Sequence, residues 1–113
     1  MRIDELNDAE ELALLGLMRE IVQADGEYTP GERAAVDALR TELGVARFDK
    51  AILRAMDAFD SRAELKEHAK TITRPEAREL IFETLKKVAA ADGVGQTEEK
   101  PLAWLASWWG LGG

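Results

Sequence analysis

The sequence has no cysteine, a single histidine and only three prolines among its 113 residues. Without cysteine the chain has no disulfide, no thiolate zinc site and no cysteine nucleophile. The prolines Pro30, Pro75 and Pro101 each lie near a position where a helix can begin. No stretch alternates polar and apolar residues as a half-buried strand does. We therefore predict an all-α fold.

Long apolar runs and basic clusters are also missing. No run approaches the length of a membrane-spanning helix, and no cationic start precedes an apolar segment as in a signal peptide. The net charge is −7, which repels phosphate backbones. We expect a cytoplasmic protein that binds no nucleic acid and does not insert into a membrane. The length suits a single domain, residues 1–113, with a modest core.

Apolar periodicity and capping residues predict about six helices. The first has apolar residues on more than one face, so we expect it to be central. The third is expected to bury Phe48, Ile52, Leu53, Met56 and Phe59. Capping boxes begin the first helix at Asn7 and the fourth at Ser61. The predicted helices cover residues 7–24, 30–43, 46–59, 62–70, 75–91 and 97–109.

An internal repeat organises the chain. The segment "LLGLMREIVQADG" at residues 14–26 aligns without gaps with "IFETLKKVAAADG" at residues 81–93. The two copies predict pseudo-symmetric halves, each a helix, an Ala-Asp-Gly turn and a second helix, with the first and fifth helices as equivalent central helices. The matching apolar pairs are Leu14 and Ile81, Leu15 and Phe82, Met18 and Leu85, and Ile21 and Val88.

Each copy ends in an aspartate where a helix dipole disfavours negative charge. Asp25 and Asp92 cost up to about 1 kcal/mol at these helix ends unless N–H donors or a cation compensate them. A glutamate follows each aspartate by seven residues, Glu32 and Glu99. Glu32 also completes a capping box with Thr29. Two interpretations therefore stay open for these loops: hydrogen-bonded structural turns, or a carboxylate site for a cation.

The loop spacing resembles only the second half of an EF-hand calcium loop. Where that loop needs oxygen ligands before the aspartate, the chain has Ile21 and Gln23 in one copy and Val88 and Ala90 in the other. The loops are therefore not EF-hands, and a cation would need carboxylates from both. We expect the two preceding helices to cross so that both loops approach each other, because antiparallel packing would separate them by roughly 25–30 Å.

The segments "IVQADGEYTPGERAAVDALRTELGV" and "TLKKVAAADGVGQTEEKPLAWLASWWGL" resemble the TerB-like family, named from tellurite resistance. The resemblance implies an all-helical bundle with an acidic site proposed to bind a metal ion. Transferred to this chain, that site is Asp25, Glu32, Asp92 and Glu99. All-oxygen ligands favour Ca²⁺ or Mg²⁺ over Zn²⁺. The resemblance also implies a link to tellurite or stress response, and protein partners that include membrane-associated ones; it predicts no oligomeric state.

Other candidate residues favour structural roles. His68 is expected to be a surface or half-buried histidine without a catalytic partner. In "WLASWW" we expect Trp104 to be buried and Trp109 to be exposed, which makes Trp109 a candidate partner contact. No nucleophile–base pair or phosphate-binding loop is visible, so no enzyme is expected. Two hypotheses remain: a non-catalytic cation-binding module, and a protein–protein interaction module whose Asp-Gly loops are structural turns.

Overall fold

The computed structural model describes residues 2–23, 30–90 and 105–110, and its regular structure there is entirely helical. The prediction of an all-α fold is confirmed. A single turn of 3-10 helix, η1, precedes five α-helices, and residues 105–109 form a further short helix. None of the helices in these ranges is long and apolar enough to cross a membrane. The bounds are η1 Ile3–Glu5, α1 Asp8–Gln23, α2 Pro30–Leu43, α3 Val45–Ala58, α4 Arg62–Lys70 and α5 Pro75–Ala90.

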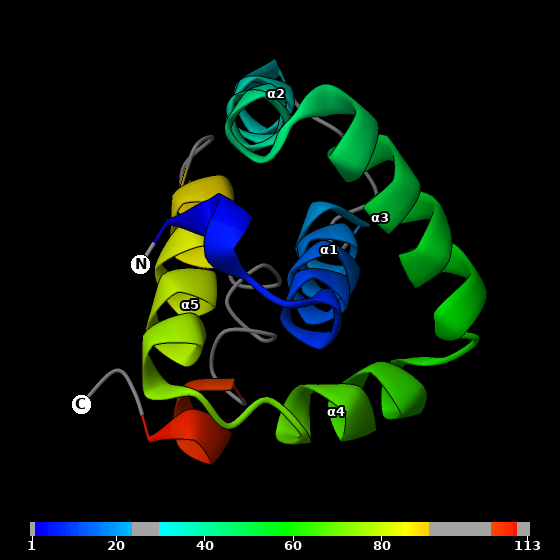
Figure 1. Ribbon diagram of the computed structural model, residues 1–113, viewed down its shortest axis with the longest axis vertical. Coiled ribbons are helices and arrows are strands. Elements are labelled where there is room, and N and C mark those ends of the chain that lie inside the picture. Colours follow the sequence, from blue (N-terminus) through cyan, green and yellow to red (C-terminus); the bar gives the residue numbers. More distant parts are fainter. Residues whose placement is uncertain (1, 24–29, 91–104, 111–113) are drawn as a thin grey trace.

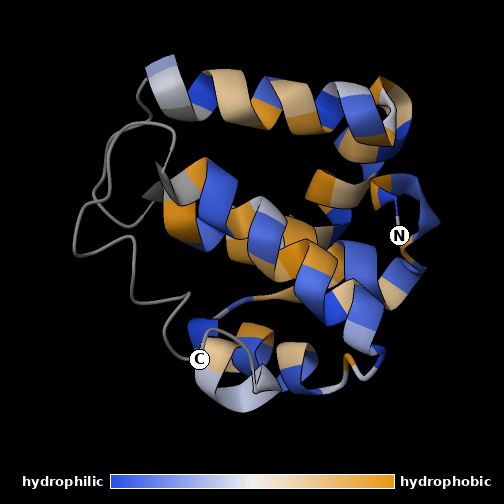
Figure 2. Ribbon diagram, turned by 90° about the vertical axis from the view of Figure 1, so that its left-hand side faces the viewer, coloured by the Kyte–Doolittle hydropathy of each residue, from blue (hydrophilic) through white to orange (hydrophobic). Residues whose placement is uncertain are grey.

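Helix α1 lies in the centre, and α2, α3, α4 and α5 surround it (Figure 1). Three of its four leucines are fully buried and Leu12 is half-buried, as the wide apolar stripe predicts. Along each surrounding helix hydrophobic and hydrophilic residues are interspersed, which is typical of helices that turn one side to a core (Figure 2). The fully buried large residues of α1 are Leu14, Leu15, Leu17 and Ile21.

Local capping sets most helix boundaries. The Asn7 side chain accepts a hydrogen bond from the Glu10 backbone at 2.8 Å, and the Glu10 carboxylate accepts one from the Asn7 backbone at 2.9 Å. This is the predicted capping box. Ser61 accepts from the Glu64 backbone at the start of α4. Gly44, with φ of 106°, separates α2 from α3 in a conformation that favours glycine.

The predicted core face of α3 is wrong in part. Leu53 and Met56 are 61% and 50% exposed, and Ala51 and Ala55 are buried in their place beside Phe48. The small alanine side chains allow α3 to pack closely on α1, so the bulky residues at 53 and 56 turn outward.

The tryptophan prediction is also wrong where it is tested. Trp109 is buried, and its indole N–H donates to the Ala69 carbonyl at the end of α4 at 3.1 Å. Trp108 is 38% exposed and lies against the Lys70 ammonium, which is 4.8 Å from the ring centre. A buried indole needs an acceptor, and the Ala69 carbonyl in the last turn of α4 supplies one while it also accepts from the Ile72 backbone N–H at 3.3 Å. Trp104 lies outside the described residues.

All eight apolar residues matched by the repeat are buried, four in α1 and four in α5. The repeat therefore predicts the core-facing positions of both helices. The two helices are not equivalent, however, because α1 is enclosed and α5 belongs to the surrounding ring (Figure 1). The Ala-Asp-Gly turns themselves lie outside the described residues.

Candidate functional site

The predicted acidic site lies almost wholly outside the described residues. Asp25, Asp92 and Glu99 belong to the ranges that the structure does not describe. Glu32 lies in the first turn of α2, where the backbone is described and the side chain is not. Across residues 2–23, 30–90 and 105–110, no group of three or more His, Cys, Asp or Glu side chains could hold a metal ion. The four-carboxylate site stays a prediction.

The helices that lead into the two acidic loops begin next to each other. Arg74, directly before α5, donates from Nε and Nη2 to the Glu10 carboxylate near the start of α1, at 2.7 and 2.5 Å. Near the ends of both helices, Ile21 of α1 and Val88 of α5 are each buried in the one hydrophobic core. The starts of α1 and α5 therefore lie together, as they would not if the two helices packed antiparallel along their length.

The Glu10–Arg74 pair is a strong local interaction. The Glu10 residue is only 2% exposed, so its charge needs partners. The hydrogen bonds from Arg74 hold the pKa of Glu10 below its ordinary value of 4.5, and the Asn7 backbone N–H acts in the same direction, while burial opposes both. The pKa of Arg74 is raised, chiefly by its hydrogen bonds to Glu10. Both groups therefore stay charged at neutral pH.

A second arginine secures the neighbouring carboxylate and the N-terminal segment. Arg47 of α3 donates to buried Glu11 at 2.6 Å and to the carbonyls of Asp4 and Leu6 at 2.8 and 2.9 Å. Since the segment before α1 has carbonyls without helical partners, these bonds satisfy groups that burial would otherwise leave unpaired. The two buried carboxylates are thus used to join chain segments and are not available as metal ligands.

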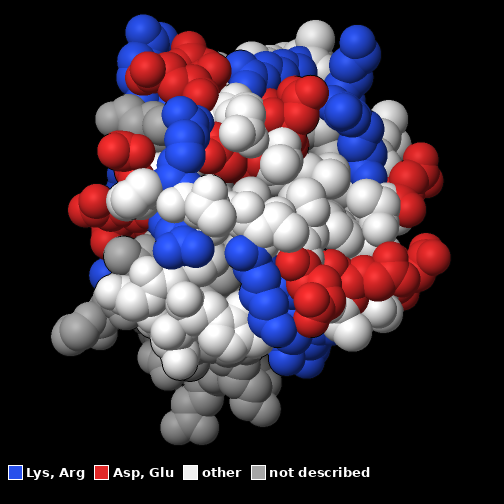
Figure 3. Space-filling model, turned by 60° about the horizontal axis from the view of Figure 1, so that its bottom comes forward, with Lys and Arg blue, Asp and Glu red and all other residues white. Residues whose placement is uncertain are grey.

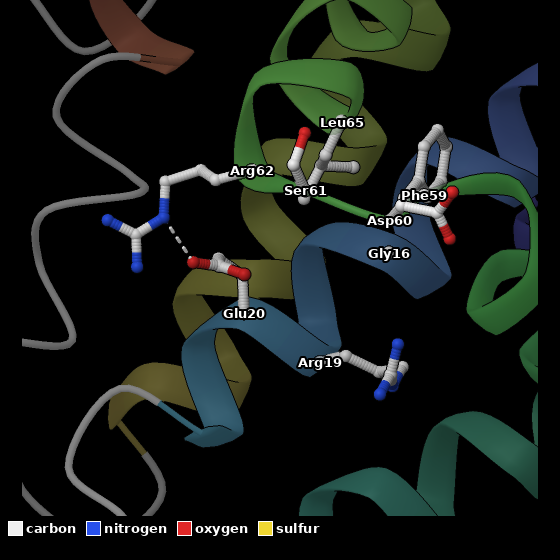
Figure 4. Close-up of a pocket in the computed structure, with 8 residues that line it drawn as sticks. All are labelled: Gly16, Arg19, Glu20, Phe59, Asp60, Ser61, Arg62 and Leu65. Atoms are coloured by element: carbon white, nitrogen blue, oxygen red, sulfur yellow. Dashed lines mark hydrogen bonds and ion pairs between the residues drawn. The ribbon is translucent and has the colours of Figure 1, made fainter.

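A pocket of about 220 Å³ lies between the middle of α1 and the start of α4 (Figure 4). Arg62 reaches across it to the Glu20 carboxylate, at 2.5 Å, while Arg19 extends toward the opposite side. The two arginines are balanced by Glu20 and Asp60, so the lining has no excess charge. Among the described residues of the lining, Ser61 carries the only hydroxyl, which caps α4, and none is a histidine. The arrangement holds no nucleophile–base pair.

Gly16 forms the floor of this pocket, and its missing side chain is what lets the elements meet. A Cβ at position 16 would lie 2.8 Å from Leu65 and 2.9 Å from the Phe59 ring. Helix α1 therefore touches α4 and the end of α3 through its backbone. Gly16 has a structural role at the site.

His68 is half-buried, as predicted. Its Nε2 lies 2.8 Å from the Ala9 carbonyl and its ring centre lies 5.3 Å from that of Phe59. Since a carbonyl can only accept, Nε2 carries the proton. The histidine joins α4 to the start of α1.

A family model for the tellurite resistance protein TerB matches residues 5–107. The chain belongs to the TerB family. The comparisons with curated proteins and with solved structures found no match. The match covers both copies of the repeat and the connecting helices α3 and α4, so it includes all five α-helices from α1 to α5.

Some of the residues that join the helices of this TerB domain are only weakly indicated by the sequence. Gly16 is a glycine inside a leucine-rich helix, where it costs about 1 kcal/mol relative to alanine and so indicates a close approach. Glu10 is identifiable as a capping residue, but its arginine partner is 64 residues away. Nothing local to Arg47 indicates that it binds Glu11 and the N-terminal segment.

Proposed function

We propose that this TerB domain is a non-catalytic module that binds one divalent cation between the loops that follow α1 and α5. The ligands would be the carboxylates of Asp25, Glu32, Asp92 and Glu99. Oxygen ligands suit Ca²⁺ or Mg²⁺ better than Zn²⁺. The family description adds a link to tellurite resistance or a related stress response, and a cytoplasmic location belongs to the same proposal.

The pairing of Glu10 with Arg74 is the observation that carries this proposal. It holds the starts of α1 and α5 together, and the same core anchors Ile21 and Val88 near their ends. The two helices have the same length, 16 residues each. Two equal helices that begin together and are buried in one core can lead into loops on one side of the molecule. Loops so related can contribute ligands to one ion.

A melting experiment tests the proposal. The melting temperature is measured in EDTA and then with excess Ca²⁺, Mg²⁺ or Zn²⁺. An ion present at about a hundred times its Kd stabilises the fold by about 2.7 kcal/mol if it binds only the folded state. We expect Ca²⁺ or Mg²⁺ to raise the melting temperature of the wild type and of Asp57→Asn, an exposed carboxylate of α3. Asp25→Asn and Asp92→Asn should remove the response. Equal responses in all four proteins, or none in the wild type, would contradict the proposal.

A second candidate function is protein–protein interaction, with the Asp-Gly loops as structural turns. The exposure of Leu53 and Met56 on α3 favours it, together with that of Trp108. The partner would be a protein, membrane-associated in one version of this hypothesis. This candidate predicts no cation response in the melting experiment, so the same titration separates the two functions.

A further inference from the structure

A shallow groove runs between α4 and the end of α3. Phe59 and Leu12 lie between this groove and the core. The groove has a volume of about 440 Å³ and is lined by Leu12, Ala58, Phe59, Ala63, Glu64, Glu67 and His68. We call it the α3–α4 groove. Its floor is apolar, and Leu12 and Phe59 are half-buried there while they also pack on the core. The volume accommodates one or two large apolar side chains.

The charged residues that line the α3–α4 groove are acidic, and the Lys70 ammonium lies 3.2 Å from one of them, the Glu67 carboxylate. The two charged lining residues are both glutamates, Glu64 and Glu67. Figure 3, in which α4 comes forward, shows an elongated group of acidic side chains in the right-hand half of this face, bordered by uncharged surface and by a band of basic side chains.

The glutamates of the groove are available to a partner. Glu64 is exposed and makes no ion pair with the described residues. Glu67 pairs with Lys70 at 3.2 Å, but both side chains are largely exposed. Exposed pairs of this kind contribute little to stability, so a cation of the partner can replace Lys70 at little cost. His68 cannot move into the groove without losing its bond to the Ala9 carbonyl, which fixes the groove's shape.

We propose that the α3–α4 groove docks a basic amphipathic segment of a partner protein. One or two apolar side chains of that segment enter the groove, and flanking lysines or arginines pair with Glu64 and Glu67. A second copy of this chain is disfavoured as the occupant, because joining two such faces would bring four glutamates together and each chain has a net charge of −7. The proposal specifies the partner for the interaction function and is independent of cation binding by the loops.

Two other surfaces are less suited to docking a basic segment. The pocket at Gly16 has balanced charges and therefore favours neither an anion nor a cation. The exposed face of α3 around Leu53 and Met56 is flanked by charges of both signs, including Lys50 and Asp57. Of these three surfaces, only the α3–α4 groove combines a concave apolar floor with a lining whose charged residues are all acidic.

The test uses a synthetic helical peptide with leucines four residues apart and lysines beside them, titrated into the full chain in EDTA. EDTA removes any bound cation. The result of the peptide titration therefore does not depend on whether the loops bind a cation. We expect amide chemical-shift changes in the NMR spectrum to centre on α4, the end of α3 and Leu12. Binding should weaken as salt is added, because the paired charges are exposed. A peptide with glutamate in place of lysine should not bind.

Two double variants that replace glutamates by lysines, one in the groove and one on α5, test where the peptide binds. The double variant Glu64→Lys/Glu67→Lys should weaken the peptide affinity at least tenfold. Glu76→Lys/Glu79→Lys, with the same spacing and charge change on exposed positions of α5, should change it less than threefold. Ala63→Lys, an exposed position inside the groove, should also abolish binding and does not threaten the core. No binding of the lysine peptide, equal losses in both double variants, or shifts centred on Leu53 or Trp108 would overturn the proposal.

Discussion

Position 16 of α1 and position 83 of α5 are equivalent in the internal repeat, and they hold opposite kinds of residue. Gly16 is buried where α1 touches Phe59 and Leu65, and Glu83 is exposed on the outer side of α5. Extending the same alignment toward the N-terminus pairs buried Glu10 with buried Ala77. The repeated apolar residues put one face of each helix into the core. What lies against the other faces differs, because α1 lies in the centre of the molecule and α5 belongs to the surrounding ring (Figure 1).

The largest effect is expected from exchanging these residues. Gly16→Glu places a charged side chain where even a Cβ would lie within 3 Å of Leu65 and Phe59. Overpacking and an unpaired buried charge should together destabilise the fold by more than about 4 kcal/mol. The reciprocal Glu83→Gly should cost about 1 kcal/mol, the helix propensity difference. Urea unfolding of both variants measures this. Similar losses would show that α1 and α5 are enclosed to the same degree.

A smaller effect is expected at the starts of the two helices. Arg74→Ala leaves the buried Glu10 carboxylate without its cation, and we expect a loss of about 2–4 kcal/mol. Arg40→Ala is the matched control, because Arg40 pairs with Asp49 in a similar two-bond geometry at an exposed site. That variant should lose about 0.2–1 kcal/mol. Equal losses would mean that burial of Glu10 does not strengthen its pair.

The same pair predicts a dependence on pH. The pKa of Glu10 is lowered in the folded state from 4.5, first by its hydrogen bonds to Arg74. A group with a lowered folded pKa stabilises the protein above its unfolded pKa, and this stability is lost as the pH falls through the folded pKa. The stability difference between the wild type and Arg74→Ala should therefore be full at neutral pH and shrink below pH 4.5. Unfolding free energies measured across this range check it, and a difference that grows in acid would contradict the assignment.

The smallest effect is expected on the outer face of α5. Lys86 is half-exposed, and its ammonium lies 3.9 Å from the Glu83 carboxylate. Lys86→Ala should change the unfolding free energy by less than about 0.5 kcal/mol in either direction. A loss of several times that size, in the same urea experiment, would indicate that α5 is more enclosed than Figure 1 shows.

Features that depend on neighbours in sequence were predictable. Pro30 and Leu43 bound α2 as expected, and the capping box at Asn7 and the cap at Ser61 form. The repeat predicted which apolar residues of α1 and α5 are buried, since a helical period places them on one face.

Features that depend on distant contacts were not predictable from the sequence. The apolar periodicity of α3 predicted a buried face that includes Leu53 and Met56. In the structure Ala51 and Ala55 are buried instead. Buried Trp109 donates its indole N–H to the Ala69 carbonyl, which lies 40 residues away in the sequence. The partner of Glu10 is equally remote in sequence. For the acidic site, the sequence supplied the four residues, and their convergence stays a prediction.

The most direct test of the central claim is the number of cations bound per chain. The claim is that the two halves of the repeat contribute to one site. Calorimetric titration of the wild type with Ca²⁺ or Mg²⁺ should give one ion per chain, and either Asp25→Asn or Asp92→Asn alone should abolish that binding. Two ions per chain, each removed by only one of these substitutions, would contradict the claim by showing two separate loops. Absence of binding in the wild type would contradict it as well.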